Sequence, residues 1–184
     1  MTTKPRVSLK EFLALPETKP YLELIDGEVV EKAMPNAMHG TLVSQIIIAL
    51  GNFLRAEPIA RVETEVRHAE PDNEWVFLPD ISITKKERRP PPAEESGPIE
   101  VMPDLAIEVL SPDDRPGRVA QRVNYYLRAG VTLVWIVDPE DESVTVFERG
   151  AESRVVTAPD ELTGEPVLPG FTLDLGRLFA SLHQ

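Results

Sequence analysis

Apolar residues recur along the chain with two different spacings, and the longer spacing predicts its helices. In the longest such segment, between His39 and Pro58, six apolar residues share one helical face: Val43, Ile46, Ile47, Leu50, Phe53 and Leu54. A second helix is predicted over 118–128, with four inward residues: Val119, Val123, Tyr126 and Leu127. Gly130 is placed to cap it. A short helix is expected after Ser8, whose spacing to Glu11 is that of a capping box.

Shorter apolar runs predict strands. Tyr21 to Lys32 predicts a hairpin, because Asp26-Gly27 favours a tight turn between two short strands. Further strands are expected at 61–70, 75–84, 104–110, 133–137 and 144–148, with an edge segment near the C-terminus before a short last helix. The helix at 118–128 separates two of these strands, which should therefore be parallel. The pattern predicts an α/β fold, a mixed sheet with helices on its faces.

Length and composition suit one globular unit. We predict a single domain over residues 1–184, since 184 residues with 42% apolar content can bury a sizeable core. Residues 85–103 combine charge runs with three consecutive prolines, so we predict a mobile loop there.

Several function classes are excluded or disfavoured by composition. The absence of cysteine excludes disulfides, thiol catalysis and thiolate metal sites. The N-terminus has no long apolar segment, so we expect a cytoplasmic protein without a membrane span. The net charge of -12 argues against nucleic-acid binding over the whole surface but allows a local basic patch. An aromatic content of 6% and the lack of a glycine-rich phosphate loop disfavour glycosidases and nucleotide-dependent enzymes.

Two acidic residues interrupt apolar strands. Glu108 lies within LAIEVLSP and Asp80 within WVFLPDISI, and a buried carboxylate is costly unless it is paired or bound to a metal. If the two strands are neighbours, alternation can bring both carboxylates to one point, where a divalent cation would relieve their repulsion. The alternative is that each acid lies at a strand end and points to water.

Six segments in this order resemble one known family: YLELIDGEVV, MPNAMHGTLVSQI, LPDISI, MPDLAIEVLSP, YYLRAGVTLVWIVDP and LPGFTLDL. The resemblance is to the Uma-two family of restriction-endonuclease-like proteins, within the PD-(D/E)XK nuclease superfamily, and covers roughly residues 8–180. It implies a restriction-endonuclease-like αβββαβ core, preceded here by a helix and a hairpin. It also implies a metal-dependent DNA endonuclease that uses Mg²⁺ or Mn²⁺.

The resemblance assigns roles to individual residues. Asp80 and Glu108 would bind the metal, with the carbonyl of Val109 as a third ligand, and the ion would polarise the phosphodiester and activate a water molecule. Glu23 would hold the metal or a metal-bound water, or else simply face solvent from the hairpin. His39 would contact phosphate or transfer protons, or else satisfy free N–H groups at the helix start.

The superfamily lysine is missing from its expected places. Two residues after Glu108 stands Leu110, and four residues before Tyr126, where the Uma-two branch has lysine, stands Arg122. Arginine can bind and orient phosphate but cannot act as a base. The first hypothesis is therefore an endonuclease with Arg122 as its cationic stabiliser. The alternative is a catalytically impaired nuclease-fold protein that binds nucleic acid or a protein partner.

Three further expectations concern the surroundings of the site. Asp104 should lie about 13 Å from Glu108 along the strand, too far to share an ion. A local basic surface for phosphate could combine residues of the loop start with residues of the second helix: Lys85, Lys86, Arg88, Arg89, Arg115, Arg118 and Arg122. A homodimer is expected, because cutting both strands of DNA often needs two active sites.

Overall fold

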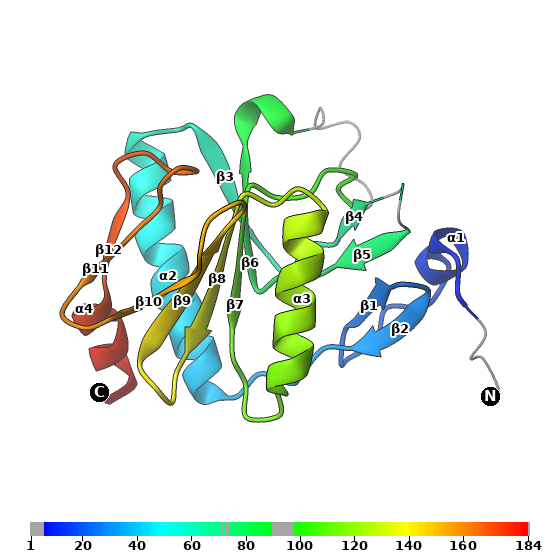
Figure 1. The fold of residues 1–184 in the computed structure, drawn as a ribbon, viewed down its shortest axis with the longest axis horizontal. Coiled ribbons are helices and arrows are strands. Elements are labelled where there is room, and N and C mark those ends of the chain that lie inside the picture. Colours follow the sequence, from blue (N-terminus) through cyan, green and yellow to red (C-terminus); the bar gives the residue numbers. More distant parts are fainter. Residues whose placement is uncertain (1–5, 71, 73, 90–97, 184) are drawn as a thin grey trace.

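The computed structural model describes residues 6–70, 72, 74–89 and 98–183, and its centre is a six-stranded sheet (Figure 1). The strand order is β10-β9-β8-β7-β6-β3. The bounds are β3 Ala60–Thr64, β6 Ile81–Lys85, β7 Leu105–Val109, β8 Leu133–Asp138, β9 Ser143–Glu148 and β10 Arg154–Thr157. Only β7 and β8 pair in parallel within this sheet. The predicted α/β fold with a mixed sheet is confirmed.

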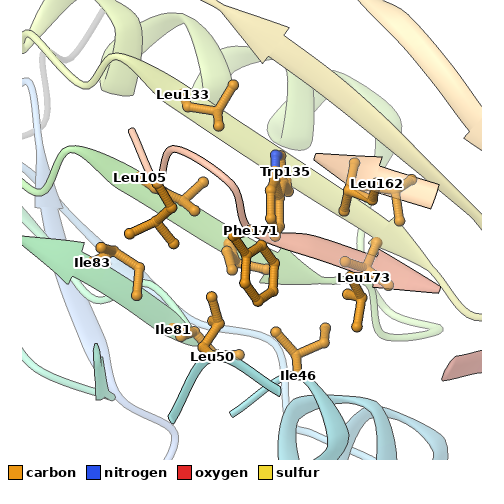
Figure 2. Packing of buried hydrophobic residues seen from close by; sticks show 14 of the residues in the cluster. Ile46, Leu50, Ile81, Ile83, Leu105, Leu133, Trp135, Leu162, Phe171 and Leu173 are labelled. Carbon is orange, nitrogen blue, oxygen red and sulfur yellow. The ribbon is translucent and has the colours of Figure 1, made fainter. Parts of the chain in front are cut away.

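Helices cover both faces of this sheet, and alternate residues of each strand pack against the helices on opposite faces. The helices are α2 (Ala37–Ala56), α3 (Pro116–Arg128) and α4 (Leu175–Ala180), the last followed by the 3₁₀ turn η4 (Ser181–His183). Leu105 and Ile107 of β7 belong to the cluster built with α2 and α4, whereas Ala106 packs with α3 on the opposite face. Figure 2 shows the first cluster, which includes Ile46 and Leu50 of α2, Trp135 of β8 and Phe171. The hairpin β11 (Glu161–Thr163) and β12 (Thr172–Asp174) adds to that side.

A smaller sheet of order β2-β1-β5-β4 lies beside the first (Figure 1). Its strands are β1 Leu22–Ile25, β2 Glu28–Glu31, β4 His68–Glu70 and β5 Trp75–Phe77. The predicted turn between β1 and β2 is confirmed, with φ of 51° at Asp26 and 76° at Gly27. The short helix α1 (Leu9–Leu13) precedes this hairpin and has the predicted capping box of Ser8 and Glu11.

Two of the predicted strands are wrong in extent, because each is broken in the middle. The run 61–70 divides at Glu65, which has a φ of 51°, and its halves enter different sheets as β3 and β4. The run 75–84 divides at Leu78-Pro79-Asp80 into β5 and β6. Proline has no N–H for a sheet ladder, so Pro79 suits a break between two strands. At each of these two breaks the chain crosses from one sheet to the other.

The predicted loop at 85–103 lies partly outside the described residues, which omit 90–97. At its ends, Lys85 closes β6, Lys86–Arg88 form the 3₁₀ turn η2, and Ile99 pairs with His68 of β4. The mobility of this segment stays a prediction.

The long helix α2 begins earlier than expected, at Ala37, because Asn36 caps it by accepting the N–H of His39. Its buried residues are Leu42, Ile46, Leu50 and Leu54, which pack on the central sheet. With a mean hydropathy of 1.4, α2 is the one helix in the described part of the chain that is long and apolar enough to cross a membrane. A core helix meets the same criterion.

Candidate active site

The two acidic residues singled out in the sequence lie opposite each other at one end of β6 and β7. These strands are adjacent and antiparallel, and the pairing of Ile81 with Ile107 places Asp80, directly before β6, opposite Glu108. Both side chains are buried, with exposures of 4% and 3%. Asp80 is held in place because its Oδ2 accepts the N–H of Val109 at 2.8 Å and lies 3.0 Å from Nε2 of His39. The carboxylates therefore share one side of the sheet.

A lysine that the sequence reasoning missed lies between the two carboxylates. The Nζ of Lys32 is 2.7 Å from Oδ1 of Asp80 and 3.4 Å from Oε2 of Glu108. The register of the hairpin could have indicated that Lys32 faces the site. The Asp26-Gly27 turn sets the register that pairs Glu23 with Val30, and alternation then turns Lys32 to the same face as Val30 and Glu23. Once Glu23 faces the site, Lys32 must face it too.

The charges in this cluster influence one another strongly. Burial alone would lower the pKa of Lys32, but the carboxylates of Glu108, Asp80 and Glu23 outweigh burial and raise that pKa to about 12. Burial opposes the charge of Asp80 as well, yet the Lys32 ammonium and the hydrogen bond from His39 bring the pKa of Asp80 below its usual value. For Glu108, burial is the largest influence and raises its pKa, against the attraction of Lys32 and Arg122. Asp80 is thus the more firmly ionised of the two acids.

Glu23 and Arg122 form a second, adjoining pair. Glu23 is fully buried, which excludes the solvent-facing alternative, and its Oε2 lies 2.8 Å from the guanidinium of Arg122. Its Oε1 accepts the N–H of Leu78 at 2.9 Å, while the carbonyl of Leu78 accepts from Lys32. Both main-chain groups of Leu78, two residues before Asp80, are therefore held by side chains of the hairpin.

Arg122 does not take the place between the carboxylates. Its nearest approach to Glu108 is 3.7 Å, from Nη1 to Oε2. Its Nε is buried and has no hydrogen-bond partner in the described structure. Four residues further along α3, the hydroxyl of Tyr126 donates to Oε1 of Glu108 at 2.6 Å. Helix α3 thus contributes a cation with a spare donor and a hydroxyl that orients Glu108.

The site opens into a cleft between the hairpin and α3. The pocket directly above the carboxylates has about 10 Å³ of free volume, close to the least that holds one water molecule. It adjoins a cleft of about 720 Å³ that Lys32 and Arg122 also line. Arg118 of the same helix and Arg115, its N-cap residue, also line this cleft.

The expected basic surface is only partly assembled. Arg88 pairs with Asp104 at 2.7 Å, at the other end of β6 from Asp80. Arg89 pairs with Glu63 of β3, which lies opposite Ser82 of β6. Asp104 also accepts the N–H of Lys85, so it serves the strand start and not the site, as predicted. The prediction that these residues join the arginines of α3 around the site is therefore wrong.

The donor set is suitable for a divalent metal ion. No three Asp, Glu or His side chains in the described ranges group as a closed, protein-only metal site. Oxygens of Asp80 and Glu108 nevertheless converge on one cationic atom, Nζ of Lys32, within 3.4 Å. Mg²⁺ is typically bound through one or two carboxylates and keeps water and substrate phosphate as its other ligands. Two converging carboxylates at the floor of an open cleft meet that requirement.

Comparisons with known proteins agree with this geometry. The family model Uma2, described as putative restriction endonuclease, matches residues 9–176. A crystal structure of a putative nuclease belonging to DUF820, from Anabaena variabilis, is similar with a TM-score of 0.84 and 32% sequence identity. The match covers 96% of this chain and 99% of that one. The search of curated proteins gave no match.

Proposed function

The chain belongs to the Uma2 family of restriction-endonuclease-like proteins, and on that premise we propose that it is a metal-dependent endonuclease that hydrolyses DNA phosphodiester bonds. The observation that carries the proposal is the convergence of two buried carboxylates, Asp80 and Glu108, on one point at the floor of a cleft. Buried acids with strongly shifted pKa values in a cleft are typical of catalytic centres.

Asp80 and Glu108 would hold the metal, with the carbonyl of Val109 proposed as a third ligand. A bound Mg²⁺ or Mn²⁺ supplies Lewis-acid polarisation of the phosphate and a water molecule of lowered pKa. His39 and the N–H of Val109 fix the orientation of Asp80, and Tyr126 fixes that of Glu108. Residues that orient metal ligands in this way raise metal affinity.

Lys32 and Arg122 would stabilise the negative charge that develops on the phosphate. With its pKa raised to about 12, Lys32 keeps its proton at neutral pH, so it acts as a cation and not as a base. The buried, unpartnered Nε–H of Arg122 is a donor that a phosphate oxygen would satisfy. Glu23 is proposed as a positioning residue, because it binds Arg122 and the N–H of Leu78.

The alternative, a catalytically impaired binding module, was based on the acidic pI of the chain and on the lack of a lysine at position 122. Lys32 removes the second argument, since it brings a lysine ammonium next to both carboxylates from a different part of the chain. Arg122 is then an additional cation and not a replacement. We therefore favour the enzyme.

Cleavage assays with matched variants test the proposal. We expect the protein to cut plasmid and single-stranded circular DNA with Mg²⁺ or Mn²⁺, and EDTA to stop it. Asp80→Asn and Glu108→Gln should each lower the rate by at least about 100-fold, because each removes a metal ligand. Asp104→Asn, a buried acid on the same side of the sheet but outside the site, is the control and should keep its activity. Cleavage that survives Asp80→Asn would refute the proposed site.

A homodimer and a cytoplasmic location remain part of the proposal. Sedimentation analysis of the purified protein would test the dimer directly.

A further inference from the structure

The proposed metal ligands lie deep in the molecule. Asp80 and Glu108 are at most 4% exposed, beneath a pocket with about 10 Å³ of free volume. A scissile phosphate must therefore descend to them. In B-form DNA the phosphates lie along two backbones that border grooves of roughly 12 and 6 Å, so bringing one phosphate into a recess requires the duplex to deform, which costs energy. The flexible backbone of a single strand can bend into such a recess.

The cleft that leads to these residues is small. Its volume of about 720 Å³ is within the range of roughly 300–1,000 Å³ that is typical of sites for one small ligand. It is bounded on one side by α3 and on the other by the β1–β2 hairpin. A short length of one strand fits a cleft of this size, whereas the body of a duplex does not.

The two walls of the cleft carry opposite charge. The α3 wall carries Arg115, Arg118 and Arg122 beside the acidic pair Asp113 and Asp114, so it is net positive and one phosphate backbone can lie along its arginines. The hairpin wall carries Asp26, Glu28 and Glu31 against the single cation Lys32, so it is net negative, and the exposed Glu28 and Glu31 repel a second backbone.

The hairpin side of the cleft also offers an apolar contact. Met34, 55% exposed, lies just after the hairpin and lines the same cleft. Single-strand binding sites usually combine a cationic groove with aromatic side chains on which bases stack, and Met34 offers the bases an apolar contact beside the arginines.

From this geometry we infer that the site accepts single-stranded DNA, or the single-stranded arm of a fork, in preference to duplex DNA. The inference rests on the proposed nuclease function of the same site and adds the strand state of its substrate. Depth, cleft volume and the one-sided charge support it independently of one another.

Cleavage of matched substrates tests the inference. One labelled oligonucleotide is supplied as a single strand, as a blunt duplex and as a fork with one unpaired arm, each with Mg²⁺ or Mn²⁺. We expect the single strand to be cut at least about tenfold faster than the duplex, and the fork to be cut within its unpaired arm. Equal or faster cutting of the blunt duplex would overturn the inference.

A binding experiment keeps the inference testable if nothing is cut. Fluorescence anisotropy with Asp80→Asn protein and Ca²⁺ compares the affinity for the single strand and the duplex. Tighter binding of the single strand supports the inference, and equal or tighter binding of the duplex overturns it. Absence of cleavage on every substrate would count against the nuclease function, whereas the binding ratio decides the strand preference.

A charge reversal on the hairpin tests the cause of the preference. The double variant Glu28→Lys, Glu31→Lys changes two exposed residues that pair opposite Ile25 and Leu22 in the β1–β2 ladder. The variant should lower the ratio of single-strand affinity to duplex affinity by about tenfold, because the two lysines attract a second phosphate backbone that the glutamates repel. Circular dichroism checks that the variant is folded. An unchanged ratio in the folded variant would exclude the acidic wall as the source of the preference.

Discussion

Lys32 is the residue on which the charge balance of the site depends. Three carboxylates, those of Glu23, Asp80 and Glu108, are buried together with the side chains of Lys32 and Arg122. Arg122 is closest to Glu23 and reaches Glu108 only at 3.7 Å, so Lys32 is the cation that contacts both Asp80 and Glu108 most closely. Its ammonium lies where the oxygens of Asp80 and Glu108 converge, and a bound metal ion must share that space.

We predict that Lys32→Met makes the fold depend on divalent metal. Without the ammonium, the free energy of unfolding in EDTA should fall by about 3–5 kcal/mol, because a buried charge is left uncompensated. Mg²⁺ should then stabilise the variant more than it stabilises the wild type, since the ion replaces the missing charge. Urea unfolding with EDTA and with Mg²⁺ measures both effects. Lys86→Met, an exposed lysine outside the site, is the control, and equal Mg²⁺ effects on variant and wild type would contradict the prediction.

The sequence identified some residues of the site more readily than others. Asp80 and Glu108 were recognisable because each interrupts an apolar run, where a carboxylate must be compensated. Lys32 carries no such mark, since it follows Glu31 at the end of a short, half-exposed strand and resembles an ordinary surface lysine. It becomes visible only when the hairpin register is combined with an inward-facing Glu23.

At the scale of elements, the site depends on how two sheets are joined. The chain leaves the small sheet after Phe77, passes through Leu78-Pro79-Asp80 and enters the central sheet at Ile81. The prediction of one continuous strand over 75–84, with side chains alternating between two faces of one sheet, does not allow for this change of sheet. Local patterns predicted each apolar run, but which sheet a run joins depends on long-range pairing, which a single sequence does not reveal.

A buried histidine makes a second connection between the sheets. His68 of β4 has Nδ1 2.8 Å from the carbonyl of Val101 and Nε2 3.0 Å from the hydroxyl of Ser82 in β6. Because a carbonyl only accepts, Nδ1 carries the proton and Nε2 accepts from Ser82. Burial lowers the pKa of His68 below the ordinary value of 6.5, so the folded protein keeps this imidazole neutral.

We therefore predict that His68 makes stability fall in mild acid. Below about pH 6.5 the unfolded chain binds a proton that the folded chain does not, so the free energy of unfolding decreases as the pH drops. The contribution of His68 is at most about 1.4 kcal/mol per pH unit. Urea unfolding between neutral pH and mildly acidic pH should show a shallower dependence for His68→Gln, which keeps a polar group but does not titrate. The same slope in variant and wild type would contradict the prediction.

At the scale of the whole molecule, a net charge of -12 argues against nucleic-acid binding over the whole surface, so the proposed contacts would be confined to the cleft. The described structure reinforces this, because Arg88 and Arg89 are already paired with Asp104 and Glu63. If DNA binds in the cleft as proposed, Arg115, Arg118 and Arg122, which line it, would be the main source of phosphate contacts.

Phosphate contacts limited to these arginines predict that the affinity for single-stranded DNA depends only weakly on salt concentration. For single strands the logarithm of the binding constant falls with the logarithm of salt concentration by about 0.7 per phosphate contact, so three arginines give a slope of about -2. Arg118→Ala should make the slope shallower by about 0.7, because Arg118 lines the cleft without contacting Asp80 or Glu108. Arg154→Ala, on the edge strand β10, removes the same charge away from the cleft and should leave the slope unchanged. Anisotropy titrations of Asp80→Asn protein at several KCl concentrations measure this slope. A slope near -5 would contradict the prediction, because more than twice as many counterions would then be released. The strand would in that case contact cations well outside the arginine wall.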